Sequence, residues 1–305
     1  MRANGPKVVH LRLQYYTCLL LKIYYKMSFV FAWCVAYWLS ACTEKGPAPQ
    51  RPSMDVQETT FLQNSDTFVM DTPADRRIFE QKWHIARKTP GGMSKKALAV
   101  MQSFLGTPYG YHLLDHSSEE HLTVNLRALD CWTSIEICLA VALTAEDTAA
   151  DYRHFCSILR QLRYRDGITN GYGSRLHYFS EWILQNARNG YVEDVTEVLG
   201  GVPCQKTVSF MTDNPVMYSQ ALNRESVQGI RAGQEAINRH KWHYFPKKQV
   251  ASIEQKLRSG DLLVLTSVEH NLDVEHQGVA VRKNGKIYLL HASSTGKKVL
   301  VSSQP

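Results

Sequence analysis

The spacing of apolar residues predicts helices along the first two thirds of the domain. Ala97, Val100, Met101 and Leu105 recur every three or four residues, which places them on one face of a helix over 94–105. Similar patterns predict helices over 75–88, 131–145, 147–164, 175–189, 215–240 and 250–258. The front half of the domain is therefore expected to be largely helical.

Strand patterns are concentrated near the C-terminal end. Short apolar runs predict strands over 261–267, 276–282, 286–291 and 298–302. Asn284-Gly285 between two of these runs is a strong signal for a two-residue hairpin loop. A helical N-terminal half packed on a late antiparallel sheet predicts the α+β class rather than alternating βαβ units.

The hairpin would bring two histidines onto one face of the sheet. With a two-residue loop Lys283 pairs with Lys286, and the continued ladder sets Gly278 opposite His291. His276 and His291 are then diagonal neighbours, ~7–8 Å apart between backbones and within side-chain reach. Gly278 removes the side chain that would crowd His291. A three- or five-residue loop would put the histidines on opposite faces, so this inference depends on the turn.

Cys131 falls at the start of a predicted helix. Asp130 is a favourable N-cap, and the apolar periodicity begins directly after it. In the first turn the helix dipole favours an anion and can lower a thiol pKa from about 8.5. The charge of Asp130 opposes a thiolate, so we expect an imidazolium at His276 to offset it. Cys138, further along the same face, is expected to be a core thiol.

A thiol, an imidazole base and a second imidazole to orient it form the arrangement of cysteine acyl-transfer enzymes. The remaining cysteines fit neither zinc ligands nor a CxxC redox pair, and a Cys156–Cys204 disulfide is open but not required. The run "RQLRYR" is interleaved with Asp151 and Asp166, which favours a solvated helix face over a basic patch.

The positive charge is concentrated in the leader. The net charge is +7, but residues 1–41 hold five basic residues and no acidic one, which leaves 30 basic and 28 acidic residues beyond. A nearly neutral body argues against a nucleic-acid partner. The 44% apolar content of the 305 residues is enough for one large core or two smaller ones.

The N-terminal segment predicts export. Basic residues are followed by "MSFVFAWCVAYWLSAC", whose apolar run is shorter than the ~20 residues of a spanning helix. Leu39-Ser40-Ala41-Cys42 resembles a bacterial lipobox. This implies a signal peptide over 1–41, lipid on Cys42, and an anchor in the envelope of a Gram-negative-type bacterium, periplasmic and on the outer membrane. Residues 42–74, with Pro-rich "TEKGPAPQRPS", would be a tether and extension, and 75–305 the domain.

Seven motifs occur in order over roughly 94–302: "FLGTPY", "LDCWTSIE", "LRYRDG", "SRLHYFSEW", "DVT", "HQGVAV" and "LLHASS". Together they closely resemble the N-acetylmuramoyl-L-alanine amidase-like family, a branch of the NlpC-type papain-like cell-wall hydrolases. The resemblance implies a papain-like fold, a Cys–His–His triad and no metal or cofactor. It implies cleavage of the amide between N-acetylmuramic acid and L-Ala in peptidoglycan fragments, preferably in their 1,6-anhydro form.

The resemblance also implies roles for single residues. Cys131 would be the nucleophile, His276 the general base and His291 its orienter, while Tyr109 and the helix N-terminal N–H groups would hold the oxyanion. Four residues of "SRLHYFSEW" would contact substrate, and they are Arg175, His177, Tyr178 and Trp182. Arg175 suits a stem-peptide carboxylate, because its guanidinium can donate two parallel hydrogen bonds to the two carboxylate oxygens. Tyr178 and Trp182 are four residues apart and fit helix packing equally well.

Two alternatives remain at this point. The first is a γ-D-glutamyl–diamino acid endopeptidase of the same superfamily, which "SRLHYFSEW" and the lack of an SH3-like targeting domain disfavour. The second is a truncated, non-catalytic envelope lipoprotein. Family members continue beyond "KKVLVSS" into a further helix and strand, whereas this chain ends at Pro305, so we expect a C-terminally shortened copy. A missing edge strand would expose backbone donors.

Overall fold

A computed structural model describes residues 17–23, 69–115, 117–218 and 223–305. The helices are α1 (Pro73–Lys88), α2 (Met93–Ser103), α3 (Cys131–Thr144), α4 (Tyr152–Arg163), α5 (Phe179–Arg188), α6 (Phe210–Asp213), α7 (Arg224–Arg239) and α8 (Lys247–Ile253). Short 3-10 turns include η1 (Arg165–Gly167), η2 (Tyr172–Ser174) and η3 (Pro215–Met217). Helices α4, α5 and α7 start later than predicted. For α4 and α7 the side chains of Asp151 and Asn223 cap the helix at its observed start.

The main sheet is antiparallel throughout and has the order β10-β9-β8-β7-β1-β4. Its strands are β10 (Lys298–Val301), β9 (Lys286–Ser293), β8 (Val274–Lys283), β7 (Leu262–Thr266), β1 (Thr17–Ile23) and β4 (Val192–Asp194). Two small pairs are β2 (Val69–Met70) with β3 (Leu122–Thr123), and β5 (Val202–Cys204) with β6 (Trp242–Tyr244). The helical front half and the late antiparallel meander were predicted, whereas β1 and β4 were not.

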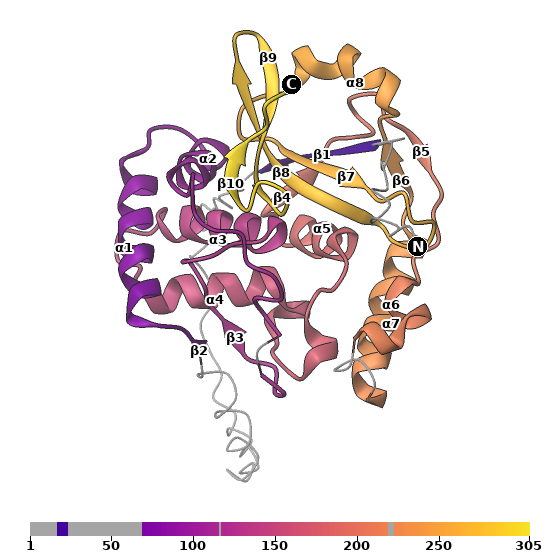
Figure 1. Cartoon of the computed structure of the whole chain (residues 1–305), viewed down its shortest axis with the longest axis horizontal. Coiled ribbons are helices and arrows are strands. Elements are labelled where there is room, and N and C mark those ends of the chain that lie inside the picture. The colour runs from indigo at the N-terminus through magenta and orange to yellow at the C-terminus, as the bar shows by residue number, and fades with distance from the viewer. Residues whose placement is uncertain (1–16, 24–68, 116, 219–222) are drawn as a thin grey trace, which may run out of the picture.

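Helix α3 is the centre of the domain. Every residue from Thr133 to Thr144 is buried. The helix contacts α1, α2 and α4 as well as β8 and β9, and Figure 1 shows it between α4 and the sheet. A helix covered on all sides has an apolar surface all round, which explains why its pattern extends beyond one stripe. Cys138 lies buried in this core, as predicted.

The β8–β9 hairpin has the predicted register. Lys283 pairs with Lys286, and Asn284 and Gly285 have φ of 50° and 80°, the left-handed pair that a type I′ turn requires. A Cβ added to Gly278 would lie 2.8 Å from the Leu290 carbonyl oxygen and 2.9 Å from the His291 Cβ. Glycine is therefore required where β8 passes the histidine.

Strand β1 lies in a segment that the sequence assigned to the leader. It pairs with β7 from Thr17↔Thr266 to Leu21↔Leu262 and with β4 from Leu21↔Asp194 to Ile23↔Val192. Processing at Cys42 would remove β1 from between its two partners, so a processed chain cannot contain this six-stranded sheet. Cys42 itself lies outside the described residues. Within the described ranges, no helix is both long and apolar enough to cross a membrane.

Removing β1 should therefore destabilise the domain. We expect a chain starting at Met27 to have a lower Tm than the full chain, because β7 and β4 lose their backbone partners. A chain starting at Leu13 keeps β1 and is the matched control. Scanning calorimetry of the three proteins provides the measurement. Equal Tm values for all three would mean that β1 contributes no pairing in solution.

Candidate active site

Asp130 fixes the first turn of α3, where Cys131 is the first residue. Its Oδ1 accepts hydrogen bonds from the backbone N–H groups of Trp132 (2.9 Å) and Thr133 (2.7 Å). The Thr133 hydroxyl in turn accepts from the Asp130 N–H at 3.0 Å, which completes a reciprocal cap. The Cys131 thiol is held half-buried at the end of the helix.

The segment before α3 sets Tyr109 beside the thiol. The Tyr109 N–H donates to the Lys297 carbonyl at 2.9 Å, and the Gly110 N–H donates to the Leu129 carbonyl at 3.1 Å. These bonds tie the loop both to the turn before β10 and to the strand-like stretch before Cys131. The Tyr109 hydroxyl makes a hydrogen bond with the Cys131 side chain.

His276 and His291 are in direct contact across the hairpin. His276 Nε2 lies 2.6 Å from His291 Nδ1, and the ring planes are nearly perpendicular at 85°. The backbone N–H of Gln277, the residue after His276, lies near the Cys131 sulfur and opposes the rise in the pKa of that thiol. Strand β8 thus carries the histidine pair to the N-terminus of α3, and the structure brings Tyr109, Cys131, His276 and His291 together.

Burial sets the protonation of this group. It raises the pKa of Cys131 to about 12, with the charge of Asp130 adding to the shift and nearby N–H groups opposing it. Burial, together with the neighbouring His291, lowers the pKa of His276 to about 4. At pH 7 the site holds a neutral thiol beside a neutral imidazole, so the expected imidazolium at His276 is absent from the unliganded site. Desolvation outweighs the helix dipole here.

The donors available to an oxyanion differ from those expected. The N–H groups of Trp132 and Thr133 already donate to Asp130, which leaves the N–H groups of Cys131 and Gln277 and the Tyr109 hydroxyl next to the sulfur. The cap that orders the helix therefore uses two of the donors that the sequence assigned to the oxyanion.

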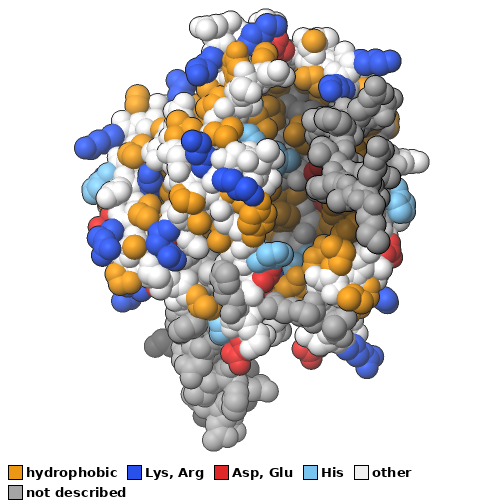
Figure 2. Space-filling view, viewed as in Figure 1, with side chains coloured by type: hydrophobic (Ala, Val, Ile, Leu, Met, Phe, Trp, Pro, Cys, Tyr) orange, Lys and Arg blue, Asp and Glu red, His pale blue; other side chains and the backbone are white. Residues whose placement is uncertain are grey.

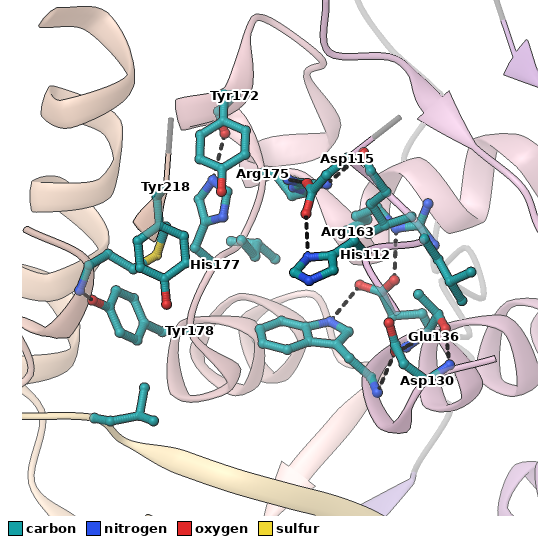
Figure 3. Close-up of a pocket in the computed structure, with 17 residues that line it drawn as sticks. His112, Asp115, Asp130, Glu136, Arg163, Tyr172, Arg175, His177, Tyr178 and Tyr218 are labelled. Atoms are coloured by element: carbon teal, nitrogen blue, oxygen red, sulfur yellow. Dashed lines mark hydrogen bonds and ion pairs between the residues drawn. The ribbon is translucent and has the colours of Figure 1, made fainter. Parts of the chain in front are cut away.

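A cavity of about 230 Å³ is lined by Asp130 and Trp132, the sequence neighbours of Cys131, and Figure 3 shows its lining. It is bordered by Trp132 and Glu136 of α3, by the 172–178 segment, and by the loop that carries His112 and Asp115. On the face drawn in Figure 2, histidine and hydrophobic side chains surround a hollow. Cys131, Tyr109, His276 and His291 are not among its lining residues, so the cavity reaches the N-terminus of α3 through Asp130 and Trp132.

Arg175 lies at this cavity but is already paired. Its exposure is only 5%, and Nη2 donates to Asp115 Oδ1 at 2.6 Å while Nη1 donates to the Leu114 carbonyl at 3.2 Å. Glu120 lies 3.7 Å from its Nε. A stem-peptide carboxylate would have to compete with two protein carboxylates, which argues against the role predicted for Arg175.

Of the other three residues predicted from the "SRLHYFSEW" motif, His177 and Tyr178 line the cavity and Trp182 does not. The His177 Nε2–H donates to the Tyr172 carbonyl at 2.6 Å, and burial lowers the pKa of His177 to about 3. The Tyr178 hydroxyl accepts from the Met211 N–H at 2.8 Å and from Gln234 Nε2 at 2.9 Å. Trp182 is fully buried and stacks on Phe179. The predicted substrate contact of Trp182 is wrong, because its side chain belongs to the core.

Several residues that line the cavity were not predicted from the sequence. Glu136 and Arg163 form an ion pair at 2.8 Å with side chains 1% and 2% exposed, and Glu136 accepts from Trp132 Nε1 at 2.9 Å. Arg163 belongs to "RQLRYR", so the solvated-face interpretation of that run is wrong for it. Trp132 and Glu136 are four residues apart in "LDCWTSIE", the spacing that could have suggested the pair.

The remaining cysteines do not form a disulfide. Cys156 and Cys204, like Cys131 and Cys138, are free thiols in the described part of the chain. Among those same residues, no cluster of three or more His, Cys, Asp or Glu side chains could hold a metal ion.

Comparison with known proteins supports an amide-cleaving site. The family model described as AmiA-like, N-acetylmuramoyl-L-alanine amidase-like, matches residues 99–305. An N-acetylmuramoyl-L-alanine amidase from Bacteroides uniformis is 35% identical with a TM-score of 0.66, over 70% of this chain and 91% of that one. A Bacteroides fragilis protein named provisionally as a xylanase is 34% identical with a TM-score of 0.62, over 67% and 90%. No curated protein matches.

Stability should fall in acid because of the buried imidazoles. The folded pKa of His276 lies below its ordinary value of 6.5, so between pH 6.5 and about 4 the unfolded chain binds a proton that the folded chain does not. The free energy of unfolding therefore decreases as the pH falls through this window. Urea unfolding at several pH values should show a shallower decrease for His276→Gln. An identical slope in both proteins would contradict the lowered pKa.

Proposed function

The chain belongs to the N-acetylmuramoyl-L-alanine amidase-like family, and on this basis we propose that it hydrolyses the amide between N-acetylmuramic acid and L-Ala by thiol catalysis. We further propose a preference for the 1,6-anhydro form. The observation that carries the mechanism is the 2.6 Å contact between His276 Nε2 and His291 Nδ1 on the strand whose Gln277 N–H meets the Cys131 sulfur.

The contact determines which nitrogen of His276 acts as the base. Nε2 faces His291, so Nδ1 is the nitrogen left for the thiol proton. In the competent tautomer Nε2–H donates to His291 Nδ1, which orients the ring and stabilises the imidazolium once it forms. The proton passes from Cys131 to His276 as the sulfur attacks the lactyl carbonyl. His276 then protonates the leaving L-Ala amine, and water hydrolyses the thioester.

The developing oxyanion would be held by the Cys131 N–H and the Tyr109 hydroxyl. Burial raises the pKa of Tyr109, and the neighbouring Cys131 and Asp130 raise it further, so its hydroxyl keeps its proton at neutral pH. A fixed donor in a partly desolvated site stabilises the transition state more than the ground state. Tyr109 is thus the side-chain donor of the oxyanion site.

The papain-like, NlpC-type placement is part of the same proposal. A cysteine at the N-terminus of a buried helix, packed on an antiparallel sheet that supplies the base and its orienter, is the arrangement that the resemblance implied. The order of these parts along the chain, α3 before β8 and β9, agrees with it.

A glycosidase activity fits the site less well. A glycosidase needs two carboxyl groups free to act as acid and base or nucleophile. The carboxylates at the cavity are engaged, since Asp130 caps α3, Glu136 pairs with Arg163 and Asp115 pairs with Arg175. The γ-D-glutamyl endopeptidase has the same triad and differs in the bond that it cleaves, which product analysis separates.

The proposed cellular location is based on the sequence of the N-terminal segment alone. We propose that a lipid on Cys42 anchors the mature chain in the cell envelope, where peptidoglycan is available. Such processing would release β1 from the sheet. The mass of the N-terminal peptide of the mature protein decides between the two states.

Product analysis tests the proposed reaction. The purified protein is expected to release the intact stem peptide from defined anhydro-muropeptides, and Cys131→Ala should lower kcat by at least about 10³-fold, because no other group can form the acyl-enzyme. Mass spectrometry identifies the products. Cleavage inside the stem would support the endopeptidase, and the absence of a thiol-dependent product would support the non-catalytic alternative.

Tyr109→Phe tests the oxyanion donor. The variant keeps the ring that packs on Tyr111 and loses only the hydroxyl. We expect kcat to fall roughly 10²-fold with little change in KM, since the lost bond forms mainly in the transition state. Tyr111→Phe, which removes the neighbouring hydroxyl, is the matched control. A fall in both variants alike would exclude a specific role for Tyr109.

A further inference from the structure

The side chain next to the nucleophile is fixed by buried charge. Trp132 follows Cys131, lines the cavity and packs edge-on against Phe179 at 5.1 Å between ring centroids. Its Nε1–H donates to Glu136 Oε1 at 2.9 Å, and Glu136 Oε2 accepts from Arg163 Nε at 2.8 Å. Arg163 is itself anchored by a bond from Nη1 to the Thr123 carbonyl at 2.6 Å. The ion pair can be followed in Figure 3.

This arrangement has an energetic cost that local packing does not explain. Removing a carboxylate and a guanidinium from water costs several kcal/mol per ion, and an apolar pair of similar size often packs as well. What the pair adds here is a fixed orientation of the indole. With the N–H engaged by Glu136 and one side packed on Phe179, Trp132 presents carbon surface to the cavity.

The direction of the cavity indicates which half of the substrate meets Trp132. The base protonates the leaving amine, so the peptide half must lie on the side of His276. None of the described residues that line the cavity belongs to β8 or β9. The cavity is lined instead by Asp130 and Trp132, the sequence neighbours of Cys131, which fits the acyl half of the substrate.

The chemistry of the lining agrees with this assignment. Both guanidiniums at the cavity are paired, Arg163 with Glu136 and Arg175 with Asp115. A stem peptide carries free carboxylates that would find no unpaired cation among these described residues. A muramoyl group is uncharged, because its one carboxyl forms the scissile amide. The volume of about 230 Å³ is below the ~300–1,000 Å³ of drug-sized ligand pockets, which suits one sugar ring.

We propose that Trp132 is a specificity-determining residue whose indole packs against the saccharide ring of the substrate, and that the Glu136–Arg163 pair positions it. The inference rests on the proposed amidase function and deepens it. The C–H face of a pyranose is apolar with a slight positive charge, and it complements the negative face of an aromatic ring.

Two substrates with the same scissile bond test the proposal. One is an anhydro-muropeptide, and the other is a lactoyl tripeptide that lacks the sugar. We expect Trp132→Ala to lower kcat/KM about ten-fold for the muropeptide, a change of about 1.4 kcal/mol, and to leave the lactoyl tripeptide unchanged within about two-fold. Trp132→Phe should lie between Ala and wild type. Equal loss on both substrates, or none, would overturn the proposal.

A binding measurement separates this inference from the proposed reaction. Titration calorimetry of Cys131→Ala with the muropeptide should show weaker binding when Trp132→Ala is added, and unchanged binding of the lactoyl tripeptide. Trp242→Phe is the control for folding and for loss of an indole, because Trp242 lies outside this cavity and donates to the Ile237 carbonyl. If wild-type protein cleaves neither substrate, the amidase proposal fails. Binding that is independent of Trp132 overturns the saccharide site alone.

Discussion

The packing of α3 against β8 and β9 is the constraint on which the site depends. It joins a helix N-terminus, which carries the thiol, to a hairpin, which carries the two imidazoles. The hairpin tolerates little change at Gly278, where an added Cβ would clash with the Leu290 carbonyl oxygen and the His291 Cβ. Because cores are close-packed, a shift of this contact would move the base relative to the sulfur. The same packing that stabilises the domain therefore sets the catalytic geometry.

Electrostatics at this junction are decided by burial more than by the helix dipole. Asp130 caps α3 and consumes two backbone donors, and its charge also opposes a thiolate. The burial that orders the site raises the pKa of Cys131 and lowers that of His276. The cost of forming an ion pair is thus deferred to the moment of reaction, when the substrate carbonyl and the oxyanion donors offset it.

The features that could be predicted from the sequence are those set by local rules. Asn284-Gly285 specified the turn, the turn specified the register, and the register brought His276 and His291 together. The N-cap at Asp130 and the resemblance of the motifs agreed on Cys131. The four late strands and most helices followed from periodicity.

The errors arose where distant contacts override local patterns. Arg163 reads as a surface residue of a basic run, yet Glu136 from another helix pairs with it in the interior. Arg175 reads as a free carboxylate ligand, yet Asp115, sixty residues away, occupies it. Spacing alone could not decide whether Trp182 belongs to the core or to the site. Strand β1 has no partner nearby in the sequence, so only the sheet reveals its pairing.

The neutral state of the Cys131 thiol also affects how fast it is oxidised. Oxidants react with the thiolate, so a cysteine whose pKa is raised to about 12 is oxidised slowly at neutral pH. If the chain works in the cell envelope, as its leader predicts, that protection matters, because the surroundings are oxidising. In the proposed mechanism, Cys131 becomes reactive only when a bound substrate aligns with His276 and the oxyanion donors. Burial would thus restrict the chemistry of Cys131 to a substrate that the site can bind.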